Sequence, residues 1–175
     1  MKKLSKFSSF FFPFLIILLA GVLAWKNYVP GTILSGWDTL HPEFNLALYL
    51  KRTFWGVWQE HQGVGAVASQ AHIAELPRLL IVGVLSLILP INLVRYSFFF
   101  LTLGMGGLGA YFLSKYFLSI HSERFSKEAA FLAGAFYILN LATLQQFYVP
   151  LEMFAVHFAT LPWLLFLAIA FLREG

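Results

Sequence analysis

Four apolar runs in this chain are long enough to cross a lipid bilayer as helices, and they restrict the possible folds more than any other feature. A helix needs about 20 mainly apolar residues to cover the hydrocarbon core. The runs cover residues 8–25, 93–118, 129–148 and 153–172. Hydrophobic residues make up 59% of the chain and the mean hydropathy is +0.76, as in multi-span membrane proteins. We therefore predict an all-α polytopic membrane protein that forms one membrane module.

A fifth apolar run, residues 77–91, is shorter, because only residues 79–89 lie between its flanking Pro-Arg and Pro-Ile-Asn segments. That length favours a re-entrant or short interfacial helix over a full crossing. Without a fifth crossing, the basic loop 119–128 lies on the same side as the amino-terminal lysines, as the positive-inside rule requires. We predict four crossings of the inner or plasma membrane, a cytoplasmic amino terminus and an extracytoplasmic loop over residues 26–76.

The beginning and end of the chain raise two further questions. Three lysines precede the first apolar run, which is also the pattern of a signal peptide. We favour an uncleaved first helix because further spans follow. The last residues come directly after a span, and we expect the chain to be the amino-terminal part of a longer protein.

Polar residues are concentrated in the first loop. Charged residues are 11% of the chain, but half of the eight acids and three of the five histidines lie there. These residues are Asp38, Glu43, Glu60, Glu75, His41, His61 and His72. The net charge of +4 does not point to nucleic acid, because the basic residues cluster at the ends of apolar runs. The chain has no cysteine, which excludes disulfides and thiolate sites.

Asp38 is the strongest catalytic candidate. A carboxylate just outside the first span, next to Trp37 and close to His41, can accept a proton from a hydroxyl group or bind a divalent cation. An Asp that caps a helix or begins a turn is the alternative. Glu60 is the better second acid and Glu43 the weaker one, although either can be a solvated loop charge. The histidines match no zinc spacing on one helix face.

Arg78 and Arg95 flank the short apolar run. At a membrane surface an arginine can hold a phosphate through paired hydrogen bonds, and His41 is a third candidate for such a contact. The alternative is an arginine that extends to the lipid headgroups, and we favour this for Arg78.

Residues 44–58 have apolar side chains at close to helical spacing, and we assign Lys51 and Arg52 to the opposite side. The pattern predicts an amphipathic helix in the membrane interface, with Trp55 and Trp58 at the level of the headgroups.

Gly104, Gly106 and Gly109 have the spacing of a dinucleotide-binding loop, but they lie within an apolar run that must be helical. We interpret Gly106, Ala110 and Ser114 as a row of small residues that lets another helix approach closely.

Short motifs along the chain follow a pattern known from one family. They are Gly36-Trp37-Asp38 with Pro42 and Leu46, then Trp58, Gly63-x-Gly65 and Gln70-Ala71, then Pro77, Leu85, Leu89-Pro90, Arg95, Gly109-x-Tyr111 and Leu161-Pro162-Trp163. With these motifs, residues 21–167 resemble the amino-terminal part of the GT-C integral-membrane glycosyltransferases, in particular the arabinofuranosyltransferase-like and YfhO-like bacterial branches.

The resemblance implies a sugar transfer from a polyprenyl-phosphate donor to a hydroxyl of a glycan or lipid acceptor at the extracytoplasmic face. It implies Asp38 as the acid or base, either Glu43 or Glu60 as a second acid, and Arg95 as a phosphate contact. Family members have at least seven spans, so this chain would be part of the catalytic module. A transporter or scaffold protein without chemistry is the alternative.

Overall fold

The computed structural model describes residues 2–36, 41–55, 58–59, 64–67, 75–121 and 126–174. Its helices are α1 (Lys2–Asn27), the short 3-10 helix η1 (Pro42–Phe44), α2 (Leu46–Trp55), α3 (Leu76–Ile88), α4 (Ile91–His121), α5 (Ser126–Leu139), α6 (Leu141–Tyr148) and α7 (Glu152–Glu174). Within these residues the only strands are the antiparallel pair β1 (Trp58–Gln59) and β2 (Ala66–Val67). The described fold is therefore almost entirely helical.

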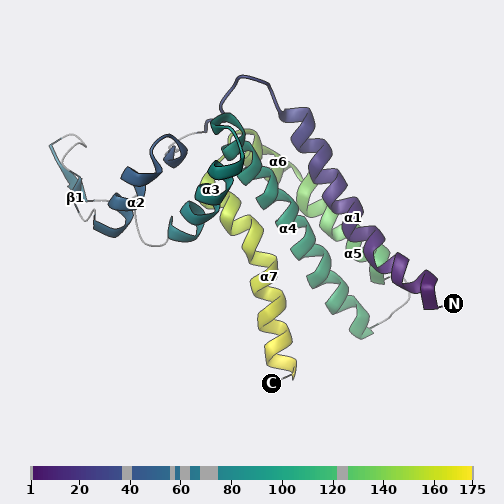
Figure 1. Ribbon diagram of the computed structural model, residues 1–175. Helices are drawn as coiled ribbons and strands as arrows, with labels where there is room; N and C mark the ends of the chain where they lie inside the picture. Colours follow the sequence, from purple (N-terminus) through teal and green to yellow (C-terminus); the bar gives the residue numbers. More distant parts are fainter. Residues whose placement is uncertain are drawn as a thin grey trace. The chain divides into compact units, whose positions relative to one another are not determined.

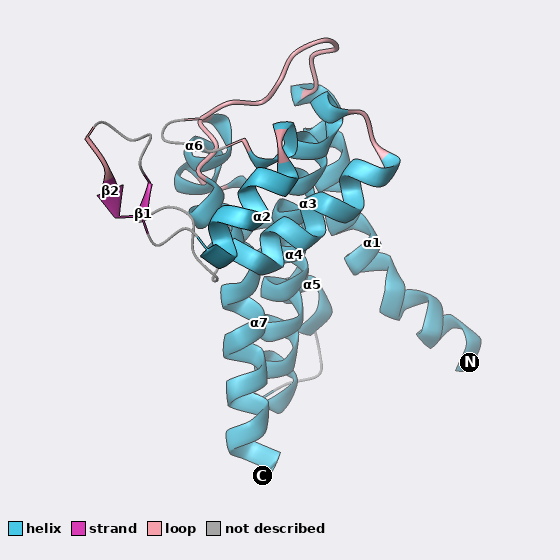
Figure 2. Cartoon of the chain, turned by 60° about the vertical axis from the view of Figure 1, so that its left-hand side comes forward, coloured by secondary structure: helices cyan, strands magenta, loops and turns pink. Residues whose placement is uncertain are grey.

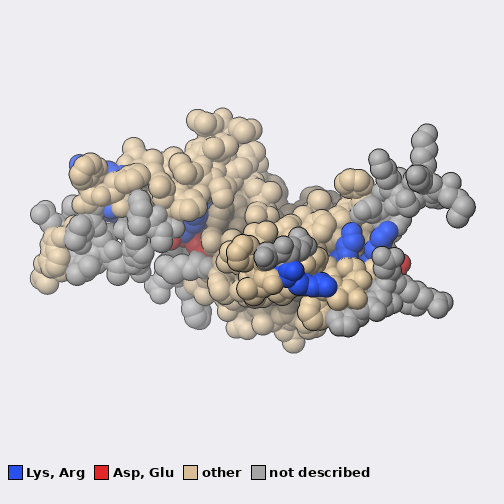
Figure 3. Space-filling view, turned by 90° about the horizontal axis from the view of Figure 1, so that it is seen from below, with Lys and Arg blue, Asp and Glu red and all other residues tan. Residues whose placement is uncertain are grey.

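Three helices, α1, α4 and α7, are long and apolar enough to cross a membrane. A fourth span results if α5 and α6 are counted as one bent span. Most of the described side chains on the face in Figure 3 are neither basic nor acidic. These features confirm a helical membrane protein whose apolar helices suit contact with a lipid bilayer.

The chain divides into two compact units. Unit 1 takes its described residues from Met1–Pro30, Ser35–Asp38 and Phe99–Gly175, and unit 2 takes its described residues from Gly31–Leu34 and Thr39–Phe98.

In unit 1, helices α1, α5 and α7 pack on α4 from Phe99 onward (Figure 1). The core contains Ile16, Leu103, Tyr111, Ala130, Ile138 and Phe158. A Cβ atom added to Gly104 would lie 3.6 Å from Ala20 Cβ, and one added to Gly107 would lie 3.1 Å from Ile16 Cγ2. Residue numbers rise along α4 as they fall along α1, so these two helices are antiparallel.

Glycines of α4 lie at helix contacts in unit 1. A Cβ on Gly106 would overlap the Phe158 ring, and a Cβ on Gly109 would lie 2.7 Å from Trp163 Nε1. The absence of a side chain at Gly109 lets the Trp163 indole donate to the Met105 carbonyl at 3.0 Å. The prediction that Gly106 lets another helix approach closely is confirmed.

The predicted span over residues 129–148 is not one continuous helix. The chain bends by 43° between α5 and α6, at Asn140. Asn140 Oδ1 accepts a hydrogen bond from the Thr143 amide at 3.0 Å, and its Nδ2 donates to Tyr137 O at 3.0 Å. The side chain thus caps α6 and bonds a carbonyl at the end of α5, which stabilises the break.

In unit 2, α2 packs on α3 (Figure 2). The contact includes Leu46, whose Cδ2 would lie 3.2 Å from a Cβ on Gly83. The predicted amphipathic helix 44–58 is shorter in the structure, because α2 begins at Leu46 and ends at Trp55.

The assignment of Lys51 to the side opposite the apolar residues is also wrong. Tyr49 and Thr53 are the buried residues of α2, and Lys51 lies on the exposed side with Leu48 and Trp55. Positions 48, 51 and 55 are three and four residues apart, so their side chains share one helix face.

Candidate functional site

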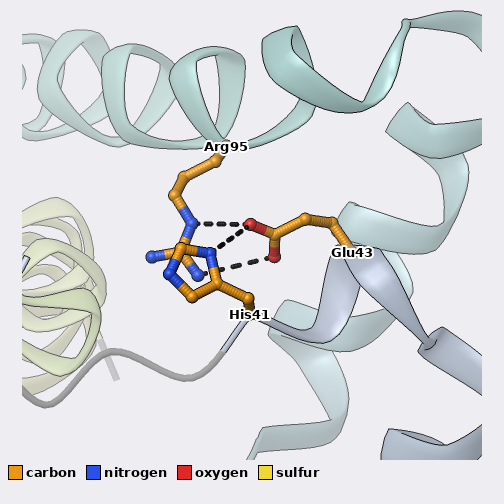
Figure 4. A network of polar contacts seen from close by, with 3 residues as sticks. All are labelled: His41, Glu43 and Arg95. Carbon is orange, nitrogen blue, oxygen red and sulfur yellow. Dashed lines mark hydrogen bonds and ion pairs between the residues drawn. The ribbon is translucent and has the colours of Figure 1, made fainter. Parts of the chain in front are cut away.

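Three polar side chains of unit 2 meet where η1 lies beside the beginning of α4 (Figure 4). Arg95 Nε donates to Glu43 Oε1 at 2.8 Å, and Arg95 Nη2 donates to Glu43 Oε2 at 3.4 Å. His41 Nδ1 lies 3.0 Å from Glu43 Oε1. We call these three residues the His41–Glu43–Arg95 cluster. It combines a two-point guanidinium–carboxylate contact with an imidazole on the same oxygen.

Local sequence holds Glu43 in this position. Pro42 begins η1, where its fixed φ angle and missing N–H suit the first turn of a helix. The Asn45 amide donates to Pro42 O at 3.1 Å, and Asn45 Oδ1 accepts from the Leu48 amide at 3.0 Å. One turn therefore ends and the next helix begins within a few residues of Glu43, which fixes the backbone on both sides of it.

Burial and charge have opposite effects on the Glu43 carboxyl. The Glu43 and Arg95 side chains are 3% and 2% exposed. Burial is the largest influence and raises the pKa of Glu43, but the Arg95 hydrogen bond and charge, a backbone hydrogen bond and His41 together lower this pKa below its ordinary value of 4.5. Glu43 is therefore an anion at neutral pH and a weak proton acceptor.

His41 is the most accessible member of the cluster. Its side chain is 24% exposed, and its ring lies 5.3 Å from the ring of Phe44. A ligand that approaches this cluster can therefore reach the imidazole more easily than either member of the ion pair.

The interpretation from sequence favoured an Arg78 side chain that extends to the lipid headgroups. In the structure this side chain is turned into the protein instead. It is 7% exposed, and its Nε lies 3.2 Å from Glu75 Oε2, three residues earlier. This second ion pair lies at the start of α3. The structure therefore gives Arg78 a protein partner and a buried position.

The structure brings together three of the six predicted site residues, His41, Glu43 and Arg95. Arg78 lies in its separate pair with Glu75. Asp38 and Glu60 lie outside the described residues. Within the described ranges, no three His, Asp or Glu side chains are grouped so that they could hold a metal ion.

The segment that leads to Asp38 is tightly packed in unit 1. A Cβ on Gly36 would overlap the carbonyl oxygen of Pro150, in the turn between α6 and α7. Pro150 is fully buried. Gly36 has no positive φ angle, so the close backbone contact is what requires glycine there. The chain is thus anchored two residues before the strongest catalytic candidate.

Comparisons of the chain with models of protein families, with curated proteins and with solved structures give no match.

Proposed function

We propose that the chain is part of a membrane glycosyltransferase that transfers a sugar from a polyprenyl-phosphate donor to an acceptor hydroxyl at the extracytoplasmic face. The main support is the buried His41–Glu43–Arg95 cluster, which follows Asp38 in the sequence of a membrane-spanning chain. A buried ion pair usually stabilises a fold no more than well-packed apolar side chains of similar volume at the same positions would. Its presence therefore favours a role in binding or catalysis.

The extracytoplasmic location of the first loop rests on the helix directions. Because α1 and α4 are antiparallel in unit 1, the end of α1 and the part of α4 near Phe99 lie at the same end of that unit. Helix α3 has 13 residues and is about 20 Å long, which is less than the hydrocarbon core of about 30 Å. We propose that α3 does not cross, which leaves four crossings if α5 and α6 form one.

The basic ends of the helices support a cytoplasmic amino terminus. Arg173, in the last turn of α7, lies over the Tyr116 ring at 5.9 Å, so the carboxyl end of α7 lies beside the late part of α4. Lys115 lies in the same part of α4 and Lys127 in the first turn of α5. Under the positive-inside rule this end of unit 1 faces the cytoplasm.

In the proposed reaction, Asp38 accepts the proton of the acceptor hydroxyl as the anomeric carbon forms its new C–O bond and the bond to the donor phosphate breaks. Proton transfer of this kind contributes about 100- to 10,000-fold to a rate. Cationic side chains stabilise the leaving phosphate as its negative charge grows. Glu60 is the remaining candidate for a second acid, because Glu43 is held as an anion by Arg95.

The donor phosphate can contact Arg95 only if the side chain becomes accessible. Its Nε and Nη2 atoms both donate to Glu43, and its side chain is 2% exposed. Because the side chain is almost completely buried, the cluster must open before the phosphate can reach the guanidinium. His41, the most accessible residue of the cluster, is the proposed first contact.

One observation favours a transporter as the second candidate function. The bent pair α5–α6 has the form of a broken span or a re-entrant loop, and transporters often place substrates at such breaks. At Asn140, however, the side chain itself satisfies nearby backbone groups. This local satisfaction leaves less reason to assign a ligand to the break.

The two functions give different results in cells that lack the complete protein containing this chain. A glycosyltransferase predicts loss of a cell-envelope glycan and accumulation of its polyprenyl-phosphate-linked sugar. Both can be measured by mass spectrometry of extracted lipids and glycans. Unchanged glycans and lipid-linked sugars, together with lost flux of a solute, would overturn the proposal in favour of transport.

A further inference from the structure

The exposed side of α2 has an unusual composition for a surface in contact with water. Leu48, Phe54 and Trp55 are 42%, 55% and 80% exposed, and exposed Lys51 lies among them on the helix surface. The opposite side, with Tyr49 and Thr53, is buried within unit 2. Large apolar side chains that are exposed together indicate a surface that another molecule covers.

The position of α3 indicates what covers it. Only Leu89 and Pro90 separate α3 from α4, which is a candidate span from Ile91 onward. One side of α3 is an exposed apolar row at helical spacing: Leu80, Ile81, Val84, Leu87 and Ile88. Since α2 packs on α3, it lies one helix away from the beginning of a candidate span. The membrane surface is therefore the nearest available partner.

The side chains of α2 fit a membrane surface with negative charge. Trp, Phe and Leu beside a basic residue are typical of helices that lie at the boundary between headgroups and acyl chains. Helix α2 has no acidic residue, and Lys51 is the basic residue that lies among its exposed apolar side chains. Juxtamembrane basic residues are attracted to anionic phospholipids, whereas a zwitterionic surface offers no such net attraction.

We infer that the exposed face of α2, formed by Leu48, Lys51, Phe54 and Trp55, binds the bilayer surface and that Lys51 selects anionic phospholipid headgroups. The apolar side chains enter the boundary region, and the Lys51 ammonium group lies at the level of the phosphates. This inference concerns the membrane contact of unit 2 and does not depend on the proposed sugar transfer.

The absence of cysteine makes a direct test possible. Leu48→Cys in the full chain provides one site for a nitroxide spin label, in nanodiscs of phosphatidylcholine alone or mixed with phosphatidylglycerol. The accessibility of the label to oxygen, divided by its accessibility to a water-soluble nickel reagent, measures how deeply the label lies in the bilayer. Lys51→Gln removes the proposed selector. Lys26→Gln is the matched control, because Lys26 is an exposed lysine at the end of α1 whose ammonium group lies 5.1 Å from the Trp25 ring.

We expect the label to lie deeper in the bilayer when phosphatidylglycerol is present. The ratio of membrane-bound to unbound α2 should then be about fivefold higher, which corresponds to the attraction of one lysine to anionic headgroups. Lys51→Gln should remove this difference and Lys26→Gln should retain it. Equal nickel accessibility in both bilayers would overturn the inference. So would dipolar broadening between labels that grows with protein density, because a second copy of the chain would then be the partner.

Discussion

Arg95 in α4 and Glu43 in η1 form a buried ion pair between residues 52 positions apart in the sequence. Because the two side chains are only 2% and 3% exposed, each charge depends on the other for compensation. The pair connects η1, within the polar loop, to the beginning of a candidate span. It is therefore the contact in unit 2 whose loss should have the clearest effect.

Replacement of Arg95 by Met should destabilise the protein by about 3–5 kcal/mol, because Glu43 would remain as a buried and uncompensated charge. The free energy of unfolding can be measured by chemical denaturation in detergent micelles. Arg95→Met combined with Glu43→Gln should lose much less stability, since neither charge then remains. A double variant as unstable as the sum of both single variants would show that the two residues do not interact.

The stability of the protein should also depend on pH through Glu43. The pKa of Glu43 is lower in the folded state than its ordinary value of 4.5. Its contribution is therefore fully present above pH 4.5 and is lost as the pH falls through the lower folded-state pKa. Unfolding curves over a pH series should show this loss for the native sequence and not for Glu43→Gln. The same acid dependence in both proteins would assign the effect to other carboxyl groups.

Gly36→Ala should destabilise unit 1 by about 1–3 kcal/mol, because its Cβ would overlap the Pro150 carbonyl and force the backbone to move. Gly21→Ala is the matched control, since a Cβ on Gly21 has no neighbour within 4 Å. Thermal unfolding should separate the two variants. If both melt at the native temperature, the tight contact between Gly36 and Pro150 does not contribute to stability.

Asn140→Ala should cost about 0.5–2 kcal/mol, because the α6 amide of Thr143 would lose its capping oxygen. Leu141→Ala is the control, because this neighbouring side chain is 85% exposed. Denaturation in micelles gives both values. An Asn140→Ala protein with native stability would mean that the bend does not depend on the cap.

The sequence predicted the features of the fold that depend on local patterns. The lengths of the apolar runs located the helices now observed as α1, α4 and α7, and the short run before α4 matches α3. The break at Asn140 was missed because an apolar run shows its length but not the preference of one side chain for capping. The orientation of Lys51 was wrong because α2 has apolar residues on both its buried and its exposed sides.

The candidate site was harder to predict than the fold. Arg95 and His41 were singled out for their residue types and positions, but no local pattern relates Glu43 to Arg95. Their pairing results from the packing of η1 beside α4. Sequence reasoning ranked Glu43 below Glu60 because an isolated loop acid shows no geometry. The proline before it and the Asn cap after it are local signals of a fixed backbone there.

Asp38→Asn in the complete protein tests the central claim most directly. Membranes containing it would be supplied with their own lipid extract as the source of polyprenyl-phosphate-linked sugar. Transfer to glycan would be measured against Glu128→Gln, which changes an exposed acid in the first turn of α5. We expect transfer to fall about 100- to 10,000-fold in Asp38→Asn, with unchanged protein level, because the hydroxyl loses its proton acceptor. Transfer by Asp38→Asn at the rate of the native protein would contradict the account.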